Sequence, residues 1–150
     1  MSALAADRAP EPSLGYALGD AVRLLRRDFY ARAKGLKLTP ALTRLLFSVH
    51  KLPGSRQAEL ASRLEVTPVT LGRMLDRLVK LRYVRRVPDA ADRRAFRVYV
   101  DRAGEPLVGR MEALAAQTTA RAVRGLSVSE QATLVRHLNR VCENLAAEDR

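Results

Sequence analysis

Apolar residues recur at helical spacings through the first part of the chain. Between Ser13 and Lys34 they follow one another at intervals of three and four residues, which predicts a helix that Ser13 caps and Gly35 ends. Thr39–Pro40 places a capping residue before a proline suited to a first helical turn. A second helix is therefore expected from there to the stop signal at Pro53–Gly54.

Two shorter helices follow, joined by a turn at residues 65–66. Ser55 is expected to cap the first of them, and Thr67–Pro68 repeats the cap-and-proline start for the second, which spans residues 67–81. The inward positions of the second helix are Leu71, Leu75 and Leu78. Its opposite side is polar and basic and carries Val69, Thr70, Arg73 and Arg77. This pattern is typical of a helix-turn-helix.

From residue 83 the pattern changes to β-branched and aromatic residues, in 83–87 and 95–100. The charged, turn-forming segment PDAADRR lies between them, so a β-hairpin is expected with Arg93 and Arg94 at its tip. Two adjacent arginines beside a basic helix favour DNA contact over a merely solvated turn. Phosphate would repel Asp92 in the same loop unless it pairs with an arginine, which predicts a supporting role.

Two further helices complete the pattern. Asp101 is expected to cap a long helix that runs to about Arg124, and Leu126–Ser127 restarts the chain into a last helix. The last helix carries apolar residues at heptad-like spacings, namely Leu134, Leu138, Val141 and Leu145. The first helix and the last two cannot all bury their apolar stripes on so small a core. A second copy of the chain, related by a twofold axis, is the simplest way to bury these apolar stripes.

The composition is that of one globular domain. The chain has 150 residues, of which 47% are apolar and 29% are charged. Its apolar runs are only a few residues long, whereas a membrane-spanning helix needs about 20. Residues 1–12 lack the features of a secretory signal and are expected to form a disordered arm. We therefore expect a cytoplasmic protein with no membrane partner.

The charge of the chain points to a nucleic acid. The net charge is +11, and arginine supplies 23 of the 27 basic residues. Residues 39–100 alone carry 13 basic and five acidic side chains. Arginine suits bidentate contacts with phosphates and base edges, so this concentration indicates a nucleic-acid surface. Arg44, Arg56 and Arg63 are further candidate phosphate contacts, although single arginines are more often ordinary surface charges.

The sequence offers little for catalysis. It contains no glycine-rich phosphate loop, no H-x-x-x-H and no recognisable pair of nucleophile and base. We predict no enzyme activity, no catalytic residues and no cofactor. One cysteine with His50 and His137 cannot make a zinc site, so no metal is expected. Cys142 is expected to be a small buried residue of the last helix; an intersubunit disulfide is the alternative if it faces a twofold axis.

The order of these elements, with QAELASRLEVTPVTLGRMLDRLVKLRYVRR and PDAADRRAFRVYVDRAG, resembles the MarR family of winged helix-turn-helix transcription regulators over residues 13–147. The most specific part is the D-x-R element of Asp92 and Arg94 between two strands. The resemblance implies a mainly α fold with a small β-hairpin wing. A winged helix-turn-helix DNA-binding lobe at 39–100 would then be flanked by dimerisation helices at 13–38 and 101–147.

The resemblance also implies a homodimer on double-stranded DNA, with the recognition helix in the major groove and the wing in the flanking minor groove. It places Arg77 at a phosphate, Arg94 in the minor groove and Asp92 as support for the wing tip. The family usually has glycine where Arg82 stands, so the recognition helix is expected to end without a left-handed cap. The implied recognition-helix contacts are Thr67, Val69, Thr70 and Arg73.

A small effector, often a phenol or an aromatic acid, is implied between the dimerisation helices and the DNA-binding lobe. Its candidate pocket walls are Leu18, Val22, Leu25, Phe47, His50 and Met111. The expected function is thus a homodimeric repressor of pseudo-palindromic operators that such a ligand releases. A ligand-insensitive or architectural DNA-binding protein with little base preference remains the alternative. A single-stranded RNA-binding module is disfavoured, because seven aromatic residues leave few stacking platforms.

Overall fold

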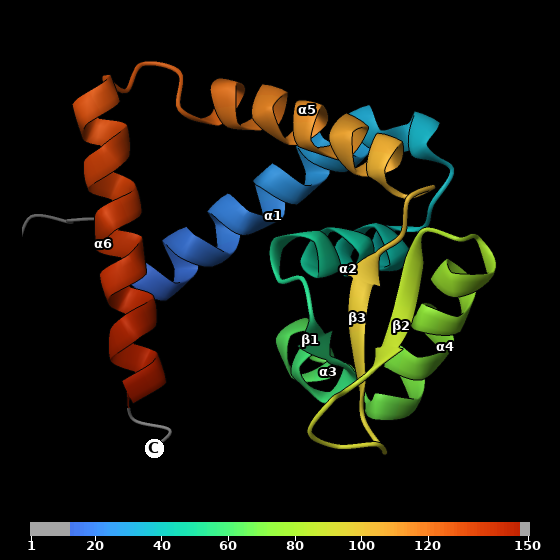
Figure 1. Ribbon diagram of the computed structural model, residues 1–150. Coiled ribbons are helices and arrows are strands. Elements are labelled where there is room, and N and C mark those ends of the chain that lie inside the picture. Colours follow the sequence, from blue (N-terminus) through green and yellow to red (C-terminus); the bar gives the residue numbers. More distant parts are fainter. Residues whose placement is uncertain (1–12, 148–150) are drawn as a thin grey trace, which may run out of the picture.

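The computed structural model describes residues 13–147, and its fold is mainly helical with a small antiparallel sheet (Figure 1). The arm expected at residues 1–12 lies outside the described residues. The elements in chain order are α1 (Leu14–Arg32), the short 3-10 helix η1 (Ala33–Leu36), α2 (Pro40–Lys51), β1 (Ser55–Arg56), α3 (Gln57–Leu64), α4 (Pro68–Lys80), β2 (Val84–Pro88), β3 (Phe96–Val100), α5 (Glu105–Ala122) and α6 (Val128–Ala147). The fold class predicted from the sequence is confirmed.

Helices α2, α3 and α4 pack with the sheet into a compact lobe, and the N-terminal part of α5 covers its upper side (Figure 1). The side chains that close its core are almost wholly removed from solvent: Leu45, Leu46, Val49, Leu60, Leu71, Leu75, Leu78, Val84, Val98, Val108 and Met111. The inward face predicted for α4 is therefore confirmed. Burial of these leucines fixes the rotation of α4 and so turns its polar side outward.

The sheet has the strand order β1–β3–β2, with β1 and β2 both antiparallel to β3. The hairpin β2–β3 lies close to where the sequence predicts it, but β1 is additional. The expectation that Ser55 caps a helix is wrong, because Ser55 pairs with Val98 and its hydroxyl donates to the carbonyl of Leu52. Helix α3 begins two residues later. There the Glu59 carboxylate accepts the backbone N–H of Arg56 at 2.7 Å.

Two other helix ends differ from their prediction. Helix α1 ends at Arg32, and Gly35 lies inside η1 instead of terminating the helix. Asp101 does not cap α5, because its carboxylate accepts the adjacent backbone N–H of Arg102 and α5 begins only after Gly104. A Cβ at Gly104 would collide with the carbonyl oxygen of Tyr83. Glycine is therefore required where this turn crosses the start of the hairpin.

The end of α4 also departs from expectation. Arg82 adopts the left-handed conformation with a φ of 59°. Its N–H donates to the carbonyl of Val79 at 2.9 Å, and the N–H of Tyr83 donates to that of Leu78 at 3.0 Å. These two bonds form a complete Schellman cap. The expectation that α4 lacks a left-handed cap is wrong, since the cap forms with arginine in the position that glycine would favour.

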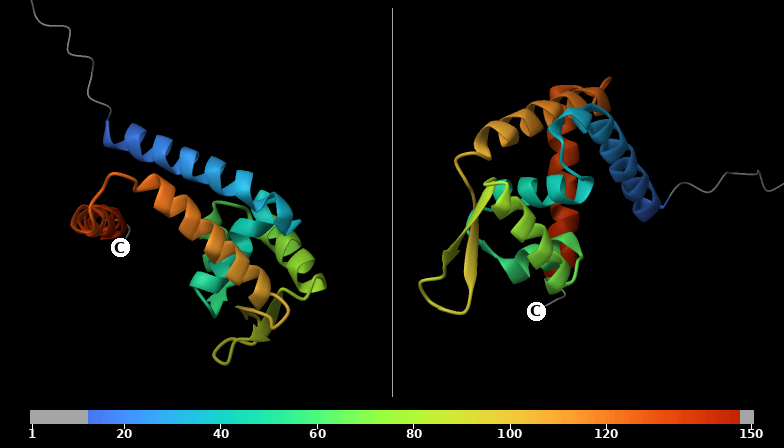
Figure 2. Two further views of the ribbon diagram at one scale, coloured as in Figure 1. Left: turned by 90° about the horizontal axis from the view of Figure 1, so that it is seen from above. Right: turned by 90° about the vertical axis from the view of Figure 1, so that its right-hand side faces the viewer.

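Helices α1 and α6 bury none of their residues within the chain. Helix α1 packs along α5, where Asp28 accepts hydrogen bonds from Arg32, Thr118 and Arg121. Helix α6 stands apart from the lobe, beyond the far ends of α1 and α5 (Figures 1 and 2). The last helix begins close to where the sequence predicts it, and the hydroxyl of Ser127 caps it by accepting the N–H of Glu130. None of the described helices is long and apolar enough to cross a membrane.

Candidate nucleic-acid interface

The outer side of α4 is exposed along its whole length. Val69, with 66% of its surface exposed, leads this side, and Thr70, Arg73 and Arg77 continue it away from the core. Thr67 caps the helix, because its hydroxyl oxygen accepts the N–H of Thr70 at 3.2 Å and its hydroxyl donates to that of Thr70 at 2.9 Å. All five residues that the sequence assigned to the recognition helix therefore lie on one exposed side of α4 or at its start.

The charges of Arg73 and Arg77 are not neutralised by a neighbouring acid of the described chain. Within residues 13–147 neither makes an ion pair, although Asp76 lies between them in the same helix. Asp76 instead pairs with Arg86 of β2, whose Nη1 lies 2.8 Å from Asp76 Oδ1. Arg86 also donates to the side chain of Gln57 on α3 at 2.7 Å. The half-buried Arg86 thus connects α3, α4 and β2.

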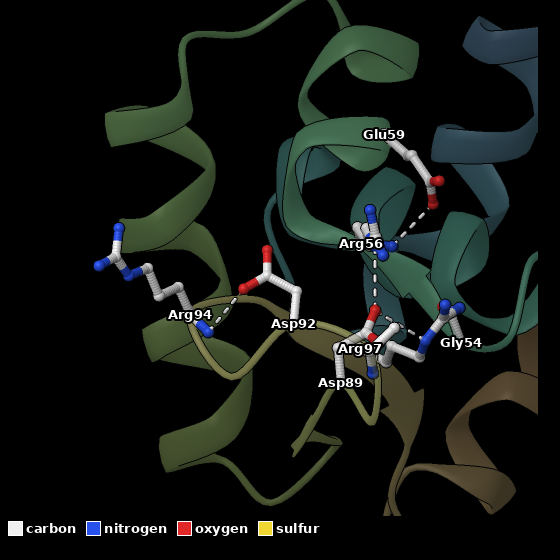
Figure 3. A network of polar contacts seen from close by, with 8 residues as sticks. Gly54, Arg56, Glu59, Asp89, Asp92, Arg94 and Arg97 are labelled. Atoms are coloured by element: carbon white, nitrogen blue, oxygen red, sulfur yellow. Dashed lines mark hydrogen bonds and ion pairs between the residues drawn. The ribbon is translucent and has the colours of Figure 1, made fainter.

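The hairpin projects from the lobe beside α4 (Figure 2). At its tip the carboxylate of Asp92 accepts the N–H of Arg94 at 3.0 Å, and the carbonyl of Asp92 accepts the N–H of Ala95 at 3.0 Å. The side chains of Arg93 and Arg94 are exposed. Asp92 makes no ion pair in the described part of the chain, and its contact with Arg94 is with the backbone N–H. It shapes the tip through the backbone (Figure 3).

The acid that does pair with arginines is Asp89, which the sequence reasoning did not single out. Its side chain is 2% exposed and lies 3.0 Å from Nε of Arg56 and 3.1 Å from Nε of Arg97 (Figure 3). The backbone N–H of Ala91, followed by the two arginines, holds its pKa below the ordinary value against the opposing effect of burial. Arg56, a candidate phosphate contact in the sequence, is therefore engaged within the fold.

The remaining arginines of the hairpin point in two directions, as their alternation along a strand predicts. Arg86 points inward, whereas Arg85 is exposed and lies over the ring of Tyr99, 5.1 Å from its centroid. Arg73 and Arg77 on α4 and Arg93 and Arg94 at the hairpin tip therefore form a basic surface of arginines that make no ion pair within residues 13–147. A second group of arginines makes ion pairs that hold the hairpin in place: Arg56, Arg86 and Arg97.

Comparison with known proteins agrees with this arrangement. Residues 36–95 match the model of the MarR family. Apo MarR from E. coli is 28% identical over 86% of this chain and 96% of that chain, with a TM-score of 0.71. The chain thus resembles the MarR family in the sequence of this segment and in its fold. The resemblance seen in the sequence is thereby confirmed.

Other solved structures of regulators also match most of this chain. Another structure of MarR is 24% identical, covers 98% of this chain and 97% of that chain, and has a TM-score of 0.77. The transcriptional repressor CouR, bound to a 23-mer DNA duplex, is 27% identical over 87% of this chain and 92% of that chain, with a TM-score of 0.70. The family and these structural neighbours are transcription regulators and not enzymes.

The chain also contains a cavity of about 430 Å³ between the lobe and the helices α1 and α5. Leu25, Phe47 and Met111 line it, as expected. The other candidate walls lie elsewhere. Leu18 and Val22 line a separate hollow on α1. His50 pairs with Glu112 of α5 across 2.9 Å.

Sequence reasoning missed the polar part of this cavity. Arg26, Arg44 and Arg63 line it from three different helices, and its lining contains no acidic residue of the described chain. Tyr30 is also part of the wall. Burial raises the pKa of Tyr30, and the positive charges of Arg44 and Arg26 oppose that shift. Spacing along the sequence gives no sign of this grouping, because the three arginines meet only through the packing of α1, α2 and α3.

The described residues contain no cluster of His, Cys, Asp and Glu able to hold a metal ion. Cys142 is exposed on α6, so its expected burial within the chain is wrong.

Proposed function

We propose that this chain is a homodimeric repressor that binds pseudo-palindromic operators in double-stranded DNA and that a small phenolic or aromatic acid ligand releases. The observation that carries the DNA-binding part is the basic surface of Arg73, Arg77, Arg93 and Arg94. These four arginines make no ion pair within residues 13–147 and are exposed on α4 and the neighbouring hairpin tip. CouR, which has the same fold, was solved on a DNA duplex.

In this proposal α4 enters the major groove. Arg73 lies on the middle of its exposed side, suited to a bidentate contact with guanine, and Val69 suits a thymine methyl group. Arg77, one turn further on, contacts a phosphate. Thr67 and Thr70 contact the DNA backbone or base edges at the helix start, where the helix dipole also favours a phosphate. The hairpin tip places Arg94 in the flanking minor groove with Arg93 beside it, and Asp92 supports the tip.

The dimer in this proposal uses 13–38 and 101–147 as its dimerisation helices, flanking a DNA-binding lobe at 39–100. Large apolar side chains remain exposed on α1, just before α6 and along α6. On α1 they are Leu14, Tyr16, Val22, Leu24 and Leu25; Leu126 precedes α6, and α6 carries Val128, Leu134, Val135 and Leu145. Such a surface costs free energy in water, and a second copy related by a twofold axis would cover it. Twofold symmetry then places the two recognition helices about one DNA turn, ~34 Å, apart.

The ligand-release part rests on the cavity at the junction of α1 and α5 with the lobe. Its aromatic wall and its three arginines suit a flat acid. A ligand there can act only by binding one arrangement of lobe and helices more tightly than the other. We propose that it favours the arrangement in which the recognition helices are wrongly spaced for an operator.

The experiment that tests this function is selection of bound duplexes from a random DNA pool, followed by affinity measurements on the enriched duplex at several salt concentrations. We expect an inverted repeat with half-sites about one turn apart. Binding without enrichment that simply collapses as salt rises would instead support an architectural protein held by phosphates alone. Preferential capture of single-stranded RNA in a parallel pool would contradict both readings.

A further inference from the structure

A buried carboxylate connects the loop end of the hairpin to the lobe, beyond the attachments that β1 and Arg86 provide. Oδ2 of Asp89 receives Arg56 and Arg97, and Oδ1 accepts the N–H of Ala91 at 2.9 Å. Arg56 ends β1 and is the N-cap residue of α3, Arg97 belongs to β3, and Ala91 lies in the hairpin loop. Asp89 therefore connects the hairpin loop to the start of α3 and to strand β3 (Figure 3).

The two arginines extend this connection further into the lobe. Nη1 of Arg97 donates to the carbonyl of Gly54 at 3.0 Å, in the turn between α2 and β1. The backbone N–H of Arg56 is held by Glu59 on the first turn of α3. These bonds thus hold the loop end of the hairpin in position relative to α2 and α3. Helix α4 packs against the same two helices.

Within residues 13–147 the hairpin tip has no comparable attachment beyond this point. The strand pairing ends at Pro88 and Phe96, with one further backbone bond from Asp89 to Ala95. The bond between Asp92 and Arg94 sets the local shape of the tip, but it joins residues two apart and cannot orient the tip relative to α4. The orientation must come from the loop end of the hairpin.

We infer that Asp89 is a positioning residue for DNA binding: its buried contacts with Arg56, Arg97 and Ala91 hold the hairpin so that Arg94 stands at a fixed place relative to Arg73 on α4. This inference rests on the proposed function, because it assumes that the hairpin tip contacts DNA. Asp89 itself is buried and touches no DNA.

A change from Asp89 to Asn tests this with little change in shape. The amide oxygen still accepts the N–H of Ala91, but the amide group cannot accept two arginine donors as the carboxylate does. Residue 89 then loses its contacts with Arg56, at the start of α3, and with Arg97 of the facing strand β3. Arg94 would have to be ordered on binding, so part of its contribution to affinity is lost.

The experiment is a double-mutant cycle of Asp89→Asn and Arg94→Ala, with affinities measured on the duplex that the unaltered chain enriches from the random pool. We expect each single variant to weaken binding about tenfold or more, and the double variant to bind hardly worse than the weaker single. A parallel cycle of Asp89→Asn with Arg73→Ala should multiply the two losses. Multiplying losses in the Arg94 cycle would overturn the inference.

A second readout separates positioning from general destabilisation. Arg94→Ala should lower the salt dependence of binding by about one counterion for each protomer of the dimer. Asp89→Asn should also lower it, although it removes no positive charge, because Arg94 is no longer held on the DNA. An unchanged salt dependence in Asp89→Asn would contradict the inference. The matched control for the change in net charge is Asp20→Asn on α1. Among the described residues Asp20 pairs only with Arg23, and the substitution should leave both quantities unchanged.

Folding is followed by thermal unfolding of every variant. If Asp89→Asn fails to fold, Arg97→Gln replaces it in the cycle, because it leaves the pair of Asp89 with Arg56 in place. The failures are distinguishable. No enriched duplex would defeat the proposed function. Full binding by Arg94→Ala would defeat both the wing contact and this inference, whereas a weakened Arg94→Ala whose loss multiplies with that of Asp89→Asn would defeat the inference alone.

Discussion

Nη1 of Arg86 lies 2.8 Å from Oδ1 of Asp76, so the acid on the outer side of α4 is neutralised from β2 rather than from its own helix. The sequence allows Asp76 to pair with Arg73 or Arg77 instead. Because Arg86 occupies it, both arginines of α4 remain without an acidic partner within residues 13–147. The same contact ties the hairpin to α4, so the two elements proposed to meet DNA are joined directly.

Arg73→Ala should relax base preference at one position in each half-site. A bidentate contact with a base contributes roughly 1–3 kcal/mol of discrimination. Affinities for duplexes that carry each base pair at each position, measured by fluorescence anisotropy, would locate the change. Arg77→Ala is the control and should weaken binding to all duplexes by a similar factor. A uniform loss in Arg73→Ala as well would make Arg73 a phosphate contact.

Arg82→Gly should stabilise the fold. The left-handed conformation of Arg82 costs a side-chain-bearing residue about 1–2 kcal/mol, which glycine avoids, while glycine loses about 0.5–1 kcal/mol more backbone entropy on folding. The expected gain is therefore roughly 0.5–1 kcal/mol in the free energy of unfolding, measured by urea denaturation. Arg82→Ala is the matched control and should show no such gain, because alanine also carries a Cβ. Equal stabilities of the two variants would count against strain at this cap.

The contact of Asp28 with α5 should make stability sensitive to acid. Hydrogen bonds from Arg32, with those from Thr118 and Arg121, lower the pKa of Asp28 from 3.8 to about 2 against the opposing effect of burial. A lowered pKa in the folded state means that the contribution is fully present above pH 3.8 and is lost as the pH falls toward 2. Unfolding measured between pH 5 and pH 2 should therefore depend less on pH in Asp28→Asn. Parallel pH profiles for the two proteins would refute this role.

Leu145→Asp should separate the proposed dimer without unfolding the protomer. Leu145 is 67% exposed on α6 of the single chain, so a charge there costs the isolated protomer little. In a dimer the same charge would be buried without a partner, which is costly. Sedimentation velocity should show a smaller species for Leu145→Asp but not for Asn144→Asp, a control at a neighbouring exposed position. An unchanged assembly would exclude this end of α6 from the interface.

The local elements were well predicted from the sequence because their signals are local. Thr67 accepts the N–H of Thr70, three residues away, and the leucine spacing of α4 fixes which side is buried. The failures lie where a distant segment takes part. The sequence of β1 is only two residues long and becomes a strand because β3 lies beside it. Asp101 looks like a helix cap, but its backbone N–H bonds to the carbonyl of Tyr83 and the helix begins later.

The sequence by itself determined the helix-turn-helix, the hairpin, the basic character of the lobe and the side of α4 that carries Arg73. Periodicity and capping depend on neighbours within a few residues, and they can be read in one dimension. Only the tertiary structure decided which arginines are free and which are engaged. Arg56, Arg86 and Arg94 look alike in the sequence. In the structure Arg56 pairs with Asp89 and Arg86 pairs with Asp76, whereas Arg94 makes no ion pair within residues 13–147. The difference arises because ion pairing follows distance in space, which the sequence does not show.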